Sequence, residues 1–323
     1  MRCRRELPTL LTGLLPATFS SGSRAAEPSA KPITLVVPFP AGSLTDSAAR
    51  AVAQPLREAL GQAVVVDNRA GAQGTLGAAH VARSAPDGHT LLVASSLMFV
   101  ARSFYRTLPY DPVDSFQPVS GIGSTSMVFM VPDASPIRSA ADLAVRAGRM
   151  DAPMSVAYGS PSGQLALALF ATASGTRPVA VSYRGIPQAL TDLVGGHVDA
   201  AVVDLGSGLA QGRTGGVRPI AMSAGTRSAL APDVPTLREA FPTAGAALET
   251  IIAVVAPAGT PPSAVRRLDE AVQAALARPS VRQQFATLTT AVLPLSPDAL
   301  GKRIGADNAR WEELIRQAGI ERE

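Results

Sequence analysis

Short apolar runs alternate with helix-like segments along most of this 323-residue chain, and that alternation constrains its fold more than any other feature. Residues 33–37 predict a buried strand, residues 64–66 and 90–94 predict further strands, and segments of helical character separate them. Strands and helices that alternate at this spacing form parallel sheets covered by helices on both faces. Because a chain of this length exceeds what one hydrophobic core usually organises, we expect an α/β protein with two domains.

The same alternation continues towards the C-terminus. We expect further strands at residues 127–131, 154–158, 179–182, 198–203, 219–223 and 251–255. The helices are expected to begin near residues 44, 75, 139, 163, 187, 263 and 296. Thr45 and Asp46 are available to satisfy first-turn amides of the first helix. Pro55 lies deep in that helix, where proline is expected to kink or interrupt it at a cost of about 3 kcal/mol.

The N-terminal segment differs from the rest of the chain. Arg2, Arg4 and Arg5 precede an apolar stretch over 7–19, and small residues follow at 23–26. This order is typical of a secretory signal peptide, which we assign to residues 1–25, with cleavage near Ala25 or Ala26. The apolar stretch, about 13 residues, is too short to cross a hydrocarbon core of ~30 Å. We therefore expect export to the periplasm, through either the general or the twin-arginine route.

Removal of this leader changes the charge and the cysteine content. The whole chain carries a formal charge of +4, but four arginines and one glutamate fall within 1–25, so the mature protein is near +1. No cluster of basic residues with interleaved aromatics follows, which argues against nucleic acid as a partner. Cys3 is the one cysteine and leaves with the leader, so disulfides, a cysteine nucleophile and cysteine metal ligands are not expected.

Three loops that follow strands are candidates for chemistry, because parallel sheets bind ligands at the carboxyl ends of their strands, next to helix N-termini. The loop over 38–46 offers a flexible Gly42 and the hydroxyls of Ser43 and Thr45. The loop over 158–164 offers two hydroxyls, two glycines and an amide, and the loop over 183–187 offers the guanidinium of Arg184. Each loop is also explained by ordinary helix capping or, for Arg184, by simple solvation.

Enzyme motifs are poorly represented. Pro161 occupies the nucleophile position of the Gly-x-Ser-x-Gly pattern over 159–163, and no phosphate-binding or dinucleotide-binding glycine motif occurs. His80, His89 and His197 lack the spacing of metal ligands, and Asp46 is better explained as a helix cap than as half of a carboxylate pair. The sequence therefore favours a binding protein over an enzyme, with no cofactor and no metal.

Several segments, taken in order, resemble the extracytoplasmic substrate-binding receptors of tripartite tricarboxylate transporters, also called the Bug family. The resemblance covers about residues 30 to 320, and the matching stretches are 31–46, 64–77, 85–92, 108–112, 183–199, 256–261, Arg310-Trp311 and 318–320. It implies a type II periplasmic-binding-protein fold, in which two lobes with mainly parallel sheets are joined by two crossing strands. Placed on this chain, one lobe comprises 27–125 plus 223–323 and the other comprises 126–222.

The resemblance also implies a function and a site. A monomeric receptor of this family binds a small carboxylate through main-chain amides, hydroxyls and water, and delivers it to membrane transporter subunits. The residues that match the family's site loops are Ala41, Gly42, Ser43, Thr45, Asp46, Ser95, Ser96, Tyr158, Gly159, Ser160, Ser162, Gly163, Gln164, Tyr183, Arg184, Gly185 and Asp204.

The chain departs from the family pattern where the ligand is expected. Ser43 replaces a second glycine, Pro161 and Gln164 alter the loop after Tyr158, and Ile251-Ile252 occupies a region where a tryptophan is usual. These changes leave the ligand open among dicarboxylates, tricarboxylates, amino acids, aromatic acids and nicotinate-like acids. They also leave open a periplasmic partner of a membrane sensor, and an enzyme that uses Ser160 or Ser162 as nucleophile.

Overall fold

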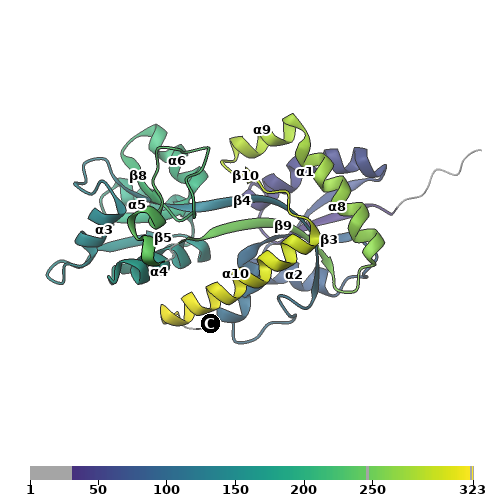
Figure 1. Cartoon of the computed structure of the whole chain (residues 1–323), viewed down its shortest axis with the longest axis horizontal. Coiled ribbons are helices and arrows are strands. Elements are labelled where there is room, and N and C mark those ends of the chain that lie inside the picture. Colours follow the sequence, from purple (N-terminus) through teal and green to yellow (C-terminus); the bar gives the residue numbers. More distant parts are fainter. Residues whose placement is uncertain (1–30, 245–246, 321, 323) are drawn as a thin grey trace, which may run out of the picture. The chain divides into compact units, whose positions relative to one another are not determined.

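The computed structural model describes residues 31–244, 247–320 and 322 (Figure 1). The predicted signal peptide and Cys3 lie outside the described residues. Within the described part, ten strands form one continuous sheet, in the order β2-β1-β3-β9-β4-β7-β5-β6, with β8 and β10 also paired to β4. The strands are β1 (Ile33–Val37), β2 (Val64–Asn68), β3 (Thr90–Ser95), β4 (Phe116–Pro132), β5 (Ser155–Tyr158), β6 (Val179–Ser182), β7 (Ala200–Asp204), β8 (Val217–Met222), β9 (Glu249–Pro257) and β10 (Ala291–Val292).

Helices follow most of these strands, as the alternation in the sequence predicts. The α-helices are α1 (Leu44–Leu60), α2 (Thr75–Ala82), α3 (Ala140–Ala147), α4 (Pro161–Ser174), α5 (Ile186–Val194), α6 (Leu205–Thr214), α7 (Leu237–Ala240), α8 (Pro262–Ala277), α9 (Pro279–Thr287) and α10 (Pro297–Gln317). Short 3-10 helices span Ala72–Gly74, Ser96–Ser103 and Pro242–Ala244.

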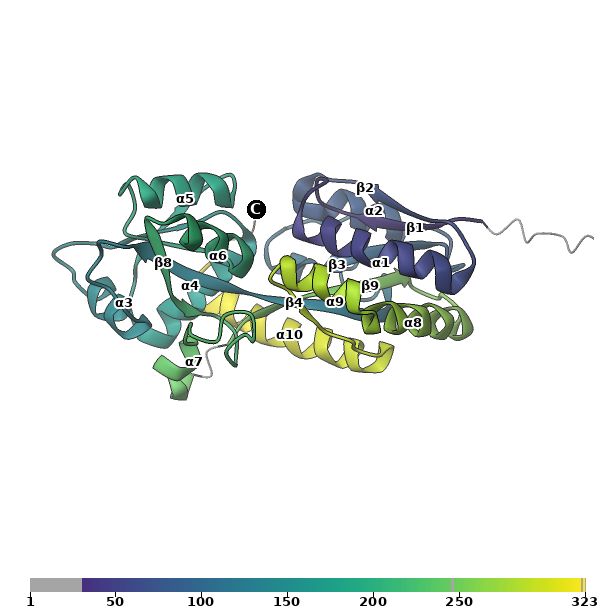
Figure 2. The ribbon, with the colours of Figure 1, turned by 90° about the horizontal axis from the view of Figure 1, so that it is seen from above.

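Two long strands connect two groups of elements. Parallel pairs join β1 to β2 and β3 on one side, and β5 to β6 and β7 on the other. Every antiparallel pairing involves β4 or β9. The first part of β4 pairs with β9, whereas its last residues pair with β7 and β8, so β4 runs from one group into the other (Figures 1 and 2). This is the two-lobed α/β arrangement that the resemblance implies.

Each group buries apolar side chains on both faces of its sheet, because successive residues of a strand point to opposite faces. On β1, Leu35 and Val37 join a core cluster with α1, α8 and α9, whereas Val36 joins a cluster with α2 and α10. On β4, Phe129 and Val131 face α3 and α4, while Val128 faces α5. The near-continuous apolar runs of the sequence thus correspond to strands covered on both faces.

The long helix α10 packs against both groups. Leu300 and Ile304, near its start, belong to the core cluster that contains Val36 of β1. Trp311 and Leu314, about two to four turns later, belong to the cluster that contains Phe129 and Phe170 of the other group. The lobe limits stay a prediction, but α10 is an element shared by the two cores.

The structure corrects two expectations about α1: Pro55 does not interrupt the helix, and the N-cap is a different residue. The helix continues without interruption through Pro55, because the buried face formed by Ala48, Val52 and Leu56 packs on the core on both sides of the proline. Its N-cap is Ser43 rather than Thr45 or Asp46, since the Ser43 hydroxyl accepts a hydrogen bond from the Asp46 N–H at 3.2 Å.

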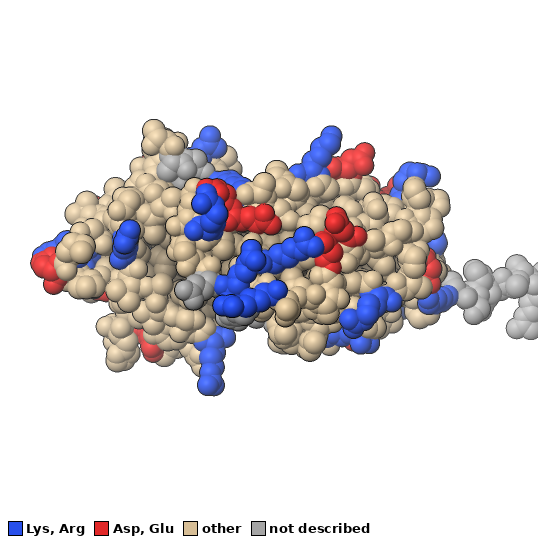
Figure 3. Space-filling view, turned by 90° about the horizontal axis from the view of Figure 1, so that it is seen from below, with Lys and Arg blue, Asp and Glu red and all other residues tan. Residues whose placement is uncertain are grey.

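The charged surface is mixed. On the face drawn in Figure 3, Lys and Arg side chains alternate with Asp and Glu side chains on a mostly uncharged surface. Among the described residues, no helix combines the length and the apolar character needed to cross a membrane.

Candidate functional site

A cavity of about 620 Å³ opens where three strands end. Ser95, Tyr158 and Ser182, the last residues of β3, β5 and β6, all line it. The complete lining is Phe39, Thr75, Ser95, Leu97, Met98, Ala101, Phe104, Tyr105, Tyr110, Tyr158, Gly159, Ser160, Pro161, Ser162, Gln164, Ser182, Tyr183, Arg184 and Ile320. The position agrees with the rule that α/β sheets bind ligands beyond the carboxyl ends of their strands.

The N-terminus of α4 forms one side of this cavity. Ser160 caps the helix, because its hydroxyl accepts a hydrogen bond from the Gly163 N–H at 3.1 Å, and Pro161 occupies the first turn, where a missing N–H costs nothing. The helix therefore begins two residues before the predicted position. Ser162 contacts β9 through its hydroxyl, which accepts a hydrogen bond from Thr250 Oγ1 at 3.5 Å. The first turn of a 14-residue helix, with its partial positive charge, borders the cavity here.

The loops after β5 and β6 touch each other at Gly159. A Cβ atom at this position would lie 2.4 Å from both the carbonyl carbon of Gly185 and the nitrogen of Ile186. Glycine is therefore required by the close approach of two backbones. This contact holds the Tyr158–Gln164 loop beside Tyr183 and Arg184.

Arg184 is the one residue with a formal charge among the described residues that line the cavity. Its side chain is exposed, and no aspartate or glutamate shares the lining. The neighbouring Tyr183 hydroxyl donates a hydrogen bond to Asp192 Oδ2 at 2.6 Å, and this bond raises the pKa of Tyr183. The cavity therefore favours an anion.

Aromatic and apolar residues, together with Thr75 and Ser95, form the rest of the lining. The aromatic and apolar residues come from the segment 97–110, from the loop after β1 and from the end of the chain. Burial raises the pKa of Tyr110 to about 12, although a hydrogen bond with Thr75 acts in the other direction, so Tyr110 is a neutral phenol here. Our loop-based prediction missed these residues because apolar residues resemble ordinary core residues in a sequence; the tyrosines at 105 and 110 were the available signal.

The structure brings eight of the predicted site residues together around this cavity: Ser95, Tyr158, Gly159, Ser160, Ser162, Gln164, Tyr183 and Arg184. Gly163 and Gly185 are adjacent in sequence to lining residues but are not part of the lining. Ala41, Gly42, Ser43, Thr45, Asp46, Ser96 and Asp204 also lie outside it.

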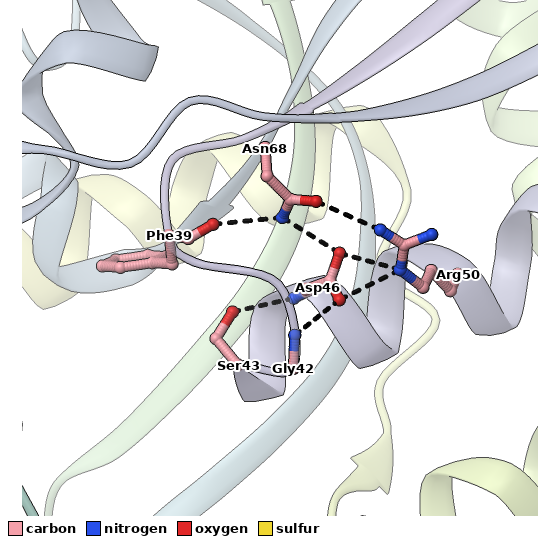
Figure 4. Close-up of polar contacts among 6 residues, drawn as sticks. All are labelled: Phe39, Gly42, Ser43, Asp46, Arg50 and Asn68. Atoms are coloured by element: carbon pink, nitrogen blue, oxygen red, sulfur yellow. Dashed lines mark hydrogen bonds and ion pairs between the residues drawn. The ribbon is translucent and has the colours of Figure 1, made fainter.

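Asp46 is bonded to the protein itself and holds the loop after β1 in place (Figure 4). Its carboxylate accepts hydrogen bonds from the Gly42 N–H at 2.9 Å, from Asn68 Nδ2 at 3.0 Å and from Arg50 Nε, which is 3.0 Å from each oxygen. Burial raises the pKa of Asp46, but these hydrogen bonds outweigh it, and the net pKa is below its usual value. Asp46 thus stays ionised and ties the loop after β1 to α1 and β2.

Ser96 and Asp204 also bond to the backbone. The buried Ser96 hydroxyl accepts a hydrogen bond from the Ile251 N–H at 3.0 Å, which links the end of β3 to β9. Asp204 Oδ1 accepts a hydrogen bond from the Ser207 N–H at 2.8 Å and so caps α6. Within the described part of the chain, no three His, Cys, Asp or Glu residues are grouped so that they could hold a metal ion.

Two α/β lobes connected by long strands, with a polar and aromatic cavity at the strand ends, define a solute-binding protein of the periplasmic class. The model of the tripartite tricarboxylate transporter family receptors matches residues 48–320, and the chain belongs to this family. The family consists of periplasmic solute-binding receptors and not of enzymes.

Solved structures of similar proteins agree. The periplasmic binding protein BugD is 31% identical, with a TM-score of 0.76 over 90% of this chain and 99% of that one. Rpa4515 of Rhodopseudomonas palustris, solved with adipate, is 32% identical, with a TM-score of 0.79 over 90% of this chain and 98% of that one. MatC of the same organism, solved with malate, is 30% identical, with a TM-score of 0.74 over 88% of this chain and 98% of that one.

Proposed function

We propose that this protein is an exported receptor that binds a small organic carboxylate in the cavity at the ends of β3, β5 and β6 and delivers it to membrane subunits of a tripartite tricarboxylate transporter. The observation that carries the proposal is the composition of the cavity: the first turn of α4, several hydroxyls and Arg184 line it, without a single acidic residue among the described lining.

The ligand carboxylate lies at the N-terminus of α4 in this proposal. The Ser162 N–H is in the first turn, where no intrahelical partner exists, and the hydroxyls of Ser95 and Ser162 and the amide of Gln164 are close by in the lining. Hydrogen bonds from such donors to a carboxylate are about twice as strong as those between neutral groups. The exposed Arg184 adds a positive charge that attracts the carboxylate.

Closure of two lobes completes the site. The cavity is lined from one side by residues of 27–125, such as Ser95 and Tyr110, and from the other by residues of 126–222, such as Tyr158 and Arg184. With β4 and β9 as the connecting strands, hinge motion brings the two sides together around the ligand. The lobe limits, 27–125 plus 223–323 and 126–222, are part of this proposal.

The similar proteins support the ligand class and the location. The chain resembles proteins solved with malate and with adipate, and its family is that of the tripartite tricarboxylate transporter receptors. The predicted signal peptide over 1–25 accounts for export to the compartment in which such receptors act.

Isothermal titration calorimetry of the mature protein, beginning at Ala26, tests the proposal. The titrants are small carboxylates, each paired with its neutral amide as a control. We expect stoichiometric binding of at least one carboxylate, no binding of its amide and no turnover of the ligand. Protein freed of co-purified ligand that binds no carboxylate in a broad panel contradicts the proposal.

A pair of serine variants locates the site. Ser162→Ala removes a hydroxyl at the second position of α4, after Pro161, and we expect weaker binding of the carboxylate. Ser263 follows Pro262 at the start of α8 in the same way, but it is exposed and outside the cavity. Ser263→Ala is therefore the matched control, and equal affinities of the two variants contradict the placement of the carboxylate.

A further inference from the structure

The tyrosines of the chain are concentrated around one cavity. The sequence contains four tyrosines, and all four, Tyr105, Tyr110, Tyr158 and Tyr183, line the cavity. Phe39 and Phe104 join them. In a chain with only 4% aromatic residues, the core alone does not explain this placement, because the tyrosines are half-buried rather than fully buried.

The cavity has two chemically different sides. The polar side consists of the loops after β5 and β6, with Ser160, Ser162, Gln164 and Arg184. The remaining lining is mostly aromatic and aliphatic, with Thr75 and Ser95 as polar members; its other residues are Phe39, Leu97, Met98, Ala101, Phe104 and Ile320, together with Tyr105 and Tyr110. A ligand that fills both sides has a charged end and a sizeable apolar body.

The hydroxyls of Tyr110 and Tyr183 have protein partners. The Tyr183 hydroxyl donates to Asp192, and Tyr110 forms a hydrogen bond with Thr75. Tyr183 has already donated its hydroxyl proton, so its ring surface is what it mainly offers a carboxylate ligand. Burial raises the pKa of Tyr110, whereas the Thr75 bond lowers it, as a bond accepted by the phenol oxygen does, so Tyr110 offers a ligand both its ring surface and its O–H. Ring surfaces favour an aromatic partner, since aromatic pairs are stabilised beyond the burial of apolar area.

Charge limits the ligand to one carboxylate. Arg184 is the one formal positive charge among the described lining residues, and it lies on the polar side. A second carboxylate would find no second positive charge among the described lining residues and would depend on neutral hydroxyls such as those of Thr75 and Ser95, which makes its burial the less favourable case. The cavity volume, about 620 Å³, is also within the range typical of sites for drug-sized ligands, which leaves room for a ring beyond a carboxylate.

We propose that the ligand of this receptor is an aromatic monocarboxylate, with its carboxylate at the N-terminus of α4 and its ring between Phe104, Tyr105 and Tyr110. This inference rests on the proposed function and narrows it. It separates this protein from the similar proteins solved with malate and adipate, whose ligands are aliphatic dicarboxylates.

Calorimetric titration of the mature protein with matched acids tests the inference. The aromatic acids are benzoate, 3-phenylpropionate and 2-naphthoate; cyclohexanecarboxylate is the saturated control, and malate and adipate are the dicarboxylates. We expect the best aromatic acid to bind at least tenfold more tightly than either dicarboxylate, and benzoate to bind more tightly than cyclohexanecarboxylate.

Two phenylalanine variants test the contribution of the ring contacts. Phe104 and Phe241 are both half-buried and pack against the same core cluster, but only Phe104 lines the cavity. Phe104→Leu should reduce the preference for benzoate over cyclohexanecarboxylate by about two- to tenfold, whereas Phe241→Leu should leave this preference unchanged.

The outcomes separate the inference from the function on which it rests. Tighter binding of malate or adipate than of every aromatic acid overturns the aromatic proposal and leaves the carboxylate receptor intact. An unchanged preference in Phe104→Leu also overturns it. Absence of binding by all six acids overturns the aromatic inference, and the broad carboxylate panel then decides whether the proposed function fails with it.

Discussion

Gly159→Ala is the substitution whose effect follows most directly from the structure. The new Cβ would lie 2.4 Å from the backbone of Gly185 and Ile186, well inside van der Waals contact, and a backbone cannot move aside as a flexible side chain does. Overpacking of this kind costs about 1–3 kcal/mol. For a chain of this size, we expect Tm to fall by roughly 2–10 °C.

Gly185→Ala is the matched control, since it alters the other side of the same contact. Gly185 has an extended backbone, with φ of −175°, and a Cβ there would meet only Pro187 Cδ, at 3.7 Å. Its Tm should therefore stay close to that of the wild type.

Thermal unfolding followed by circular dichroism, together with carboxylate titration, measures both consequences. Gly159→Ala must also weaken ligand binding, because the loop that carries Tyr183 and Arg184 has to move away from the loop that follows β5. A Gly159→Ala protein as stable as Gly185→Ala and with unchanged affinity would refute the close contact of these two loops.

Three further predictions concern other residues. Asp46→Asn should lower the free energy of unfolding by about 1–3 kcal/mol at pH 7. Because the folded-state pKa of Asp46 lies below its usual 3.8, the stabilisation by its carboxylate is fully present above that value and is lost as the pH falls through the lower folded-state pKa. Urea unfolding should therefore show the stability difference between wild type and variant narrowing in acid, and a constant difference would contradict the hydrogen-bond network around Asp46. Arg184→Gln should weaken carboxylate binding by about two- to fivefold and reduce the salt dependence of binding, because the guanidinium is exposed and its charge is screened by salt. Titration at low and high salt measures both effects, and an unchanged affinity would show that Arg184 does not contact the ligand. Ser223→Ala should lower the free energy of unfolding, measured in urea, by about 1–3 kcal/mol. The fully buried Ser223 hydroxyl accepts a hydrogen bond from the Met127 N–H at 2.9 Å and donates one to the Leu248 carbonyl oxygen at 2.7 Å. A variant as stable as the wild type would contradict the role of these two hydrogen bonds.

The strands that are apolar along their whole length could be predicted from the sequence. The strand predicted at 33–37 is β1, and those predicted at 64–66, 90–94 and 179–182 lie within or coincide with β2, β3 and β6. In β1 and β3 the apolar runs reflect burial on both faces. The strands β2 and β6 end the strand order and are half-buried or exposed, so their signal in the sequence was the β-branched valines.

The first half of β4 could not be recognised in this way. Only 127–131 was predicted, whereas the strand begins at Phe116. The stretch before Met127 contains Gly121 and Gly123, where a Cβ would lie 2.9 Å from Leu293 O and 2.8 Å from Phe285 Cε1. These glycines are explained by segments that pack against β4 from far along the chain, and such contacts leave no periodic signal in the sequence.

The candidate site was predictable where it consists of loops after strands. Ser95, Tyr158 and Arg184 were selected for that reason and lie around one cavity. The part of the lining that contains Phe104 was not predicted, because apolar residues carry no signal that distinguishes a ligand cavity from a core; the nearby tyrosines were a signal that the loop-based prediction did not use. Asp46 illustrates the converse, since a polar residue in a promising loop bonds to Arg50 and Asn68 instead of lining the cavity.

A crystal structure of the mature protein with a bound carboxylate tests the central claim most directly. We predict electron density for the carboxylate within hydrogen-bonding distance of the first turn of α4, near Ser162, with the body of the ligand against Phe104 and Tyr105. A ligand bound with high occupancy elsewhere, for example at the loop that holds Asp46, would contradict the account.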